Sequence, residues 1–156
     1  MINKVDHLIV AVKDIEEAEN NFSKLFGAAP VWTGEHPALG TVNSIFNFSN
    51  IYFELLASKG EGAGADFVND RISNQGEGLA GLVLGADRLD LIRKKILDKG
   101  YRIGEISDGY ARDNNGNIRK WQNLFLPTSL SRGIFSFLIK HTAVSYTHLT
   151  LPTNSG

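Results

Sequence analysis

One order of elements occurs twice along the chain, and this repetition constrains the fold more than any other feature of the sequence. An apolar, β-type run at KVDHLIVAVK leads into a helical segment and a closing glycine, and the same order recurs at LAGLVLGADRLDLIRKKILDKG. Leu82 stands 74 positions after Leu8 in the matching run. Further short apolar runs follow each copy. We therefore expect two βαβββ modules, one over about residues 3–58 and one over about 78–141.

The first copy shows the local signals most clearly. Alternation in its opening run places His7 on the same strand face as Ile9. Asp14 followed by Glu17 is typical of a helix N-terminus, and Gly27 suits the turn after the helix. The runs TVNSIFNF and IYFELLA then predict two strands joined by a short turn. GEHPALG before them is typical of a turn, and SKGEGAGA after them predicts a glycine-rich loop. In the second copy, Asp87 is the predicted N-cap of the helix, and YRIG after the closing glycine predicts a strand.

Two such modules indicate an α+β fold. We expect a curled mixed sheet around a shared cleft, with the helices on its outer face. Inward side chains of four strands would converge in that cleft, which is the usual setting of a small-molecule site.

Composition excludes several kinds of partner. The net charge is −1, and no basic stripe suited to nucleic acid is present. No apolar run reaches the ~18 residues that a membrane span requires, and the N-terminus has no secretion signal. The chain has no cysteine, which fits a reducing cytoplasm. We expect a cytoplasmic protein whose partner is a small molecule.

The last residues differ in character from the rest. Residues 141–156 carry no Lys, Arg, Asp or Glu, although these make up 21% of the chain. The run VSYTHLTLPT, from Val144, resembles the translation of a transposon-type sequencing adapter. We therefore expect a domain over residues 1–143 and a non-native, adapter-derived tail over 144–156, as in an open reading frame of metagenomic origin.

Two polar residues inside apolar strands are the first candidates for a site. His7 in VDHLIV is either a hydrogen-bonded core imidazole or a metal-binding or acid–base group. Glu54 lies between Phe53 and Leu55, where an unpaired buried carboxylate would be costly. A metal shared with His7, or an ion pair with His7 or an arginine, would compensate its charge.

Three sequence stretches of the first module resemble those of a known family. VDHLIVAVKDIEEAENNFSKLFG, GEHPALGTVNSIFNF and IYFELLA are similar to the glyoxalase-like domain subgroup of the vicinal oxygen chelate superfamily, which also holds extradiol dioxygenases and bleomycin-resistance proteins. The resemblance covers roughly Asn3 to His141. It implies a divalent metal held by inward positions on the first and fourth strands of each module.

Carried onto this chain, the resemblance implies that His7 and Glu54 are ligands of one divalent ion, Zn, Fe, Mn or Ni, and are catalytic as well. In the second module Gly81 stands at the matching first position and offers no side chain. Ile139 and His141 both fit the last position, and His141 would be the third ligand. The residues predicted to bind substrate are His36, Thr41, Asn43, Tyr52 and Trp121. Arg119 is interpreted as a surface arginine.

Two functions remain open at this point. The first is a metal-dependent enzyme of lyase, isomerase or dioxygenase type that acts on a small, oxygen-bearing substrate. The second is a non-catalytic protein that binds a small molecule or drug without metal, like the resistance proteins of the superfamily. The chain would act alone or as a homodimer.

Overall fold

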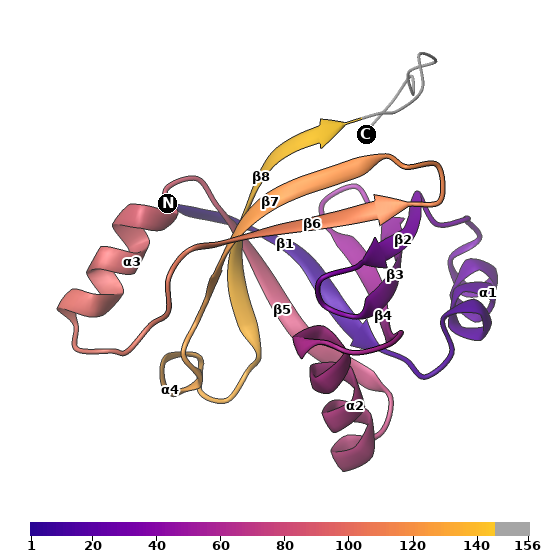
Figure 1. The fold of residues 1–156 in the computed structure, drawn as a ribbon, viewed down its shortest axis with the longest axis horizontal. Coiled ribbons are helices and arrows are strands. Elements are labelled where there is room, and N and C mark those ends of the chain that lie inside the picture. Colours follow the sequence, from indigo (N-terminus) through magenta and orange to yellow (C-terminus); the bar gives the residue numbers. More distant parts are fainter. Residues whose placement is uncertain (146–156) are drawn as a thin grey trace.

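The structure is a computed structural model that describes residues 1–145 (Figure 1). Apart from Val144 and Ser145, the predicted tail over 144–156 lies outside the described residues. The elements, in chain order, are β1 (Ile2–Ala11), α1 (Ile15–Phe26), β2 (Trp32–His36), β3 (Thr41–Asn47), β4 (Tyr52–Ser58), α2 (Ala63–Gln75), β5 (Gly78–Ala86), α3 (Leu89–Asp98), β6 (Ser107–Asp113), β7 (Ile118–Phe125), α4 (Thr128–Ser131) and β8 (Ser136–Ser145).

The strands of the described chain form one closed sheet in the order β1-β4-β3-β2-β6-β7-β8-β5. Strands β1 to β4 with α1 make up the first module, and β5 to β8 with α3 make up the second. The order is mirrored, because each module places its first strand beside its last. The prediction of a curled, mixed α+β sheet built from two βαβββ modules is therefore confirmed.

Two strand pairs join the modules, and they differ in extent. Strands β1 and β5 run antiparallel along most of their length, and Leu8 lies beside Leu82. Strands β2 and β6 are paired only at Gly34 with Asp113 and at Glu35 with Arg112. Leu8 and Leu82, which occupy matching positions in the two copies of the sequence, therefore lie side by side at the longer of the two junctions.

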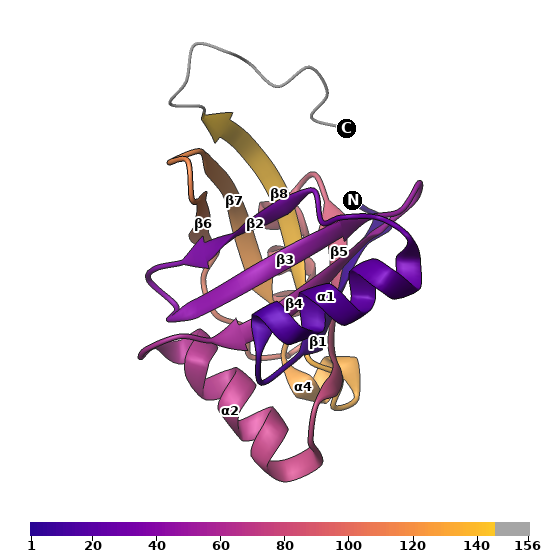
Figure 2. The same cartoon turned by 90° about the vertical axis from the view of Figure 1, so that its right-hand side faces the viewer.

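The helices lie outside the sheet, as Figures 1 and 2 show. Helix α1 packs on β3 and β4, where the Phe22 ring contacts Phe53 at a tilt and the Phe26 ring contacts it edge to face. Helix α3 packs on β7 and β8 through Leu89, Ile92 and Ile96. Helix α2, between the modules, contacts β4 and β1. In the described chain, no helix is long and apolar enough to cross a membrane.

Several local predictions are corrected by the structure. The turn-rich stretch GEHPALG is partly extended, since β2 runs through His36, and α2 begins at Ala63, inside the predicted glycine-rich loop. The run YRIG, predicted as a strand, forms none, and β6 begins later at Ser107. Asp87 does not cap α3, because its carboxylate pairs with the N-terminal amine of Met1.

Asp14 caps α1 as predicted. Its Oδ1 accepts a hydrogen bond from the Glu17 backbone N–H, and Gly27 closes the helix with a φ of 67°. We expect Asp14→Ala to lower the free energy of unfolding by about 1 kcal/mol, because the orphaned N–H loses its acceptor. Urea denaturation of this variant and of Asp14→Ser, which keeps an acceptor, measures the effect. An equal loss in both variants would contradict the capping role.

Candidate functional site

The inner face of the closed sheet encloses a cavity of about 280 Å³. This volume is near the lower end of the roughly 300–1,000 Å³ range of small-molecule sites. Side chains of strands β1 to β4, β6 to β8 and helix α2 line the cavity. Most of its wall is apolar, and the polar groups gather on β1, β3 and β4 at one side.

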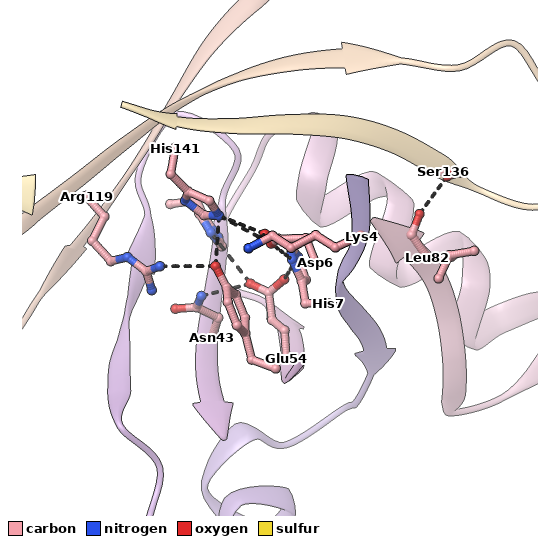
Figure 3. Close-up of polar contacts among 11 residues, drawn as sticks. Lys4, Asp6, His7, Asn43, Glu54, Leu82, Arg119, Ser136 and His141 are labelled. Atoms are coloured by element: carbon pink, nitrogen blue, oxygen red, sulfur yellow. Dashed lines mark hydrogen bonds and ion pairs between the residues drawn. The ribbon is translucent and has the colours of Figure 1, made fainter. Parts of the chain in front are cut away.

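Glu54 of β4 is the centre of this polar group (Figure 3). Its Oε1 lies 3.2 Å from Nε2 of His7 on the adjacent strand β1, and its Oε2 accepts a hydrogen bond of 2.8 Å from Asn43 Nδ2 on β3. Nε2 of His36 lies 3.8 Å from the same oxygen. Glu54 is largely buried, so these contacts compensate a carboxylate that has little access to water.

Asp6 orients His7 from behind. Asp6 Oδ2 lies 2.7 Å from Nδ1 of His7, which directs Nε2 of the ring at Glu54. The neighbour in sequence reaches the ring because β1 bulges between Val5 and His7, which breaks the strict alternation of side chains. Asp6 is only 2% exposed, whereas Val5 is 40% exposed. The Tyr52 ring is stacked on the other side of His7, with 5.1 Å between ring centroids.

These contacts separate the protonation states of the three groups. Burial works against charge on His7, but hydrogen bonds to Asp6 and Glu54 outweigh it and raise the pKa of His7 to about 9. Burial also works against charge on Glu54 and Asp6, yet their contacts with histidines hold the pKa of both carboxyls below the usual range. At neutral pH the site therefore holds a protonated His7 between two carboxylates.

His36 is a neutral counterpart to His7. Its Nδ1 shares a hydrogen bond of 2.8 Å with the Thr41 hydroxyl, and burial lowers the pKa of the ring. The ring contacts Trp121 edge to face across the cavity. Thr41 thus fixes the ring orientation, and Nε2 is left facing the Glu54 side of the cavity.

The ring of His141 on β8 is bonded to Tyr52 and Asp6 rather than to His7 or Glu54. Its Nε2 lies 2.8 Å from the Tyr52 hydroxyl and 3.2 Å from Asp6 Oδ1. Burial raises the pKa of Tyr52, so that hydroxyl stays protonated. His141 therefore contacts the outer side of Asp6, with Lys4 Nζ at 3.7 Å from the same carboxylate.

A family model for the glyoxalase-like domain matches residues 5–154 of the sequence. The chain belongs to this glyoxalase-like family. The predicted membership of the vicinal oxygen chelate superfamily is confirmed, because the family and the fold agree. No curated protein has a sequence that matches the chain.

Solved structures show the same fold as the glyoxalase-like chain at low sequence identity. Methylmalonyl-CoA epimerase from Streptomyces coelicolor, in complex with 2-nitronate-propionyl-CoA, is 20% identical with a TM-score of 0.70, covering 93% of this chain and 99% of that one. The epimerase from Mycobacterium tuberculosis is 17% identical (TM-score 0.70, 91% and 90% covered). A hypothetical protein from Bacillus halodurans C-125 is 19% identical (TM-score 0.70, 90% and 96% covered).

The glyoxalase-like chain brings every residue of the predicted site to one cavity. The members are His7, Glu54, His141, His36, Thr41, Asn43, Tyr52 and Trp121. Hydrogen bonds and ion pairs described above join all of these residues except Trp121, directly or through Asp6, and Trp121 contacts the His36 ring. Their catalytic and substrate-binding roles stay predictions, because position alone does not assign a role.

The implied metal fits this donor set poorly. Within residues 1–145, no group of three or more His, Asp or Glu side chains is arranged so that it could hold a metal ion. His7 and Glu54 face each other, but His141, the predicted third ligand, is bonded to Asp6 and Tyr52 instead. The metal-ligand assignment of these three residues stays a prediction, and no chemical step is derived from a metal below.

The second module has apolar groups where the superfamily pattern would place ligands. Phe135 fills the space beside Gly81, since a Cβ there would lie 2.9 Å from Cδ2 of the ring. In the first module Leu8 pairs with Phe53, the residue before Glu54. At the matching place in the second module Leu82 pairs with Ser136, the residue before Phe137. Phe137, rather than Ile139 or His141, is thus the counterpart of Glu54.

Sequence reasoning missed Asp6 and Arg119. Asp6 precedes His7 directly, and an acidic residue next to a candidate histidine is a signal that could have found it. Arg119 lines the cavity, although the sequence had suggested a surface position. Trp121, Asn123 and Phe125 line the cavity from the same strand at alternate positions, so the alternation of β7 also pointed to Arg119.

Proposed function

We propose that this glyoxalase-like chain is an isomerase-type enzyme that moves a proton at a carbon next to a carbonyl group of a small substrate. The observation that carries the proposal is the buried contact of 3.2 Å between Glu54 and protonated His7 on the wall of the cavity. A base and an acid with pKa values pushed apart, held side by side, are suited to this chemistry.

Glu54 is the base in this reaction. In the empty cavity His7 holds the carboxylate strongly ionised, which makes it a weak base. When a substrate carbonyl takes the hydrogen bond of His7 Nε2–H, Glu54 loses that contact and its proton affinity rises. Its carboxylate then removes the proton from the neighbouring carbon, which gives a planar enolate. Once the enolate has turned in the cavity, the Glu54 carboxylic acid returns the proton to the opposite face of that carbon, and this inversion completes the isomerisation.

His7 is the acid. The substrate oxygen gains negative charge as the proton leaves the carbon, and the His7 imidazolium stabilises this charge. Asp6 keeps the ring protonated and aligned throughout. Asn43 holds the second oxygen of Glu54, so the carboxylate does not rotate away from the substrate.

The second candidate function is ligand binding without chemistry. The observation that favours it is the apolar wall that Phe135 and Phe137 build opposite Glu54, where the superfamily pattern implies ligands. A protein of this kind would bind an apolar molecule tightly and leave it unchanged.

Solvent deuterium incorporation separates the two functions. A panel of small 2-oxo acids, 2-hydroxy acids and acyl thioesters is incubated with the protein in D₂O and followed by proton NMR. We expect at least one compound to exchange its C–H next to the carbonyl above the rate of the buffer alone. Compounds that stabilise the protein against heat but never exchange would favour the binding function.

Metal content is measured on the same preparation. We expect exchange to persist after dialysis against EDTA, because the proposed steps use only protein groups. Loss of exchange with EDTA and its recovery with Zn, Fe, Mn or Ni would favour the metal-dependent enzyme that the family resemblance implies. His7→Ala would then lose bound metal as well as activity.

A further inference from the structure

Arg119 of β7 stands on the cavity wall opposite the Glu54 group. Figure 3 shows Arg119 and His141 pointing from the second module toward His7, Asn43 and Glu54. The Arg119 guanidinium donates a hydrogen bond of 3.3 Å to the Tyr52 hydroxyl. Its Cζ lies 5.4 Å from the centroid of the Trp32 ring and 5.8 Å from that of Tyr52. Two aromatic rings thus fix the position of this cation.

The charge of Arg119 is not matched by an acid. Among residues 1–145, no carboxylate lies within 4.0 Å of its guanidinium, whereas the His7 ring contacts two carboxylates. A guanidinium presents several N–H donors in a planar fork, and a single hydroxyl uses only part of it. A half-buried arginine held in this way on a cavity wall is suited to receive an anion that enters the cavity.

Two buried acceptors indicate that the cavity receives a polar ligand. Asn43 and Asn123, which are 3% and 9% exposed, both line the cavity, and the Oδ1 atom of each has no hydrogen-bond partner in the described chain. A buried acceptor without a donor destabilises the folded protein, because it has lost its hydrogen bonds to water and gained none. A hydroxyl or N–H group of a bound molecule would offset that cost.

The remaining wall sets the shape of such a molecule. Phe135 and Phe137 pack against each other and against Phe125, and all three line the cavity. An apolar body of modest size fits a space of about 280 Å³ beside these rings.

We propose that the cavity takes a small monocarboxylate with an apolar body and that Arg119 is the residue that selects its carboxylate. This inference rests on the proposed function, because the carbon that Glu54 would deprotonate belongs to this molecule. Arg119 holds the carboxylate at one side, the body lies against the phenylalanines, and the reacting carbon faces Glu54. Arg119 thus determines specificity and takes no proton.

Matched probes test the charge requirement. Mandelate carries a carboxylate, a hydroxyl donor and a phenyl body, and mandelamide differs only in its neutral amide. Phenylacetate with phenylacetamide and isovalerate with isovaleramide form two further pairs. We expect titration calorimetry with the wild-type protein to give tighter binding of the acid than of its amide in at least one pair.

The variants test the residue. We expect Arg119→Gln to weaken binding of the preferred acid about tenfold or more and to leave binding of its amide unchanged, because a charged hydrogen bond is lost. Arg119→Lys retains the charge but not the fork, and should lie between the two. Arg112→Gln is the control, since Arg112 is exposed on β6 and pairs with Glu35 outside the cavity. Circular dichroism verifies that each variant is folded.

The outcomes separate this proposal from that of proton transfer. If each amide binds as well as its acid, or if Arg119→Gln binds the acid as well as wild type, the carboxylate proposal is overturned. Glu54→Gln should bind the acid at least as tightly as wild type, since it removes a negative charge from the cavity. Acid-selective binding with no deuterium exchange in any of these probes or in any compound of the panel above would sustain the role of Arg119 and reject the isomerase.

Discussion

Glu54→Gln is expected to lower the rate of deuterium exchange by roughly 10²–10⁴-fold, which is the usual contribution of a general base. Glutamine has nearly the same shape and can still contact His7 and Asn43, but its amide cannot accept the substrate proton. The loss should appear in kcat rather than in KM, because the substrate is held by other groups. The assay uses the panel compound that wild type exchanges fastest.

Glu35→Gln is the matched control for this prediction. Glu35 carries the same charge on strand β2 of the same module, but it pairs with Arg112 outside the cavity. Its exchange rate should equal that of wild type. Full activity in Glu54→Gln, or an equal loss in both variants, would reject Glu54 as the base.

Asp6→Ala is expected to lower the free energy of unfolding by about 3–5 kcal/mol, as is typical when one partner of a buried ion pair is removed. Asp6 is almost fully buried and contacts both His7 and His141. Its loss leaves the His7 imidazolium with Glu54 as its one remaining charged contact in the described chain. Urea denaturation at pH 7 measures the change. Asp108→Ala, the same substitution at an exposed position of β6, should change stability little.

The same variant should alter how stability depends on pH. The folded-state pKa of His7 is about 9, above the ordinary value of 6.5. Protonated His7 therefore contributes fully below about pH 6.5, and this contribution is lost as pH rises toward 9. Wild type should lose stability across this range, and Asp6→Ala should lose less, because Asp6 helps to raise that pKa. An unchanged slope, or a stability loss below 1 kcal/mol at pH 7, would contradict the role of Asp6.

The sequence carries enough information for much of the fold because its two modules use the same local signals. Alternation put His7 and Ile9 on one strand face, the family resemblance implied inward positions for His7 and Glu54, and both side chains line the cavity. The Asp14 cap was also visible in the sequence and marks the start of α1. Strand β6 was harder to predict from the sequence, because SDGYARD has few apolar residues and no regular alternation. Its pairing with β7 compensates for this weak local preference.

The site was harder to predict where backbone irregularity or distant register decides the outcome. Alternation alone would turn Asp6 away from His7, and only the bulge in β1 brings the two side chains together. The choice between Ile139 and His141 depended on the register of β8 against β5, which the sequence does not specify and which places Phe137 at that position. His36 was expected in a turn, but its place at the end of β2 beside Thr41 is what aims its ring at Glu54.

The mirrored sheet also draws the lining of one cavity from two modules, so that different kinds of residue come from different halves of the chain. The proposed base and acid, Glu54 and His7, come from the first module together with Asp6, whereas the phenylalanines and Arg119 come from the second. On these proposals, substitutions in β7 and β8 would change which molecule is accepted while the geometry of β1 and β4 stays intact. Ligand choice would then be open to redesign in one half of a duplicated scaffold, with the other half held constant.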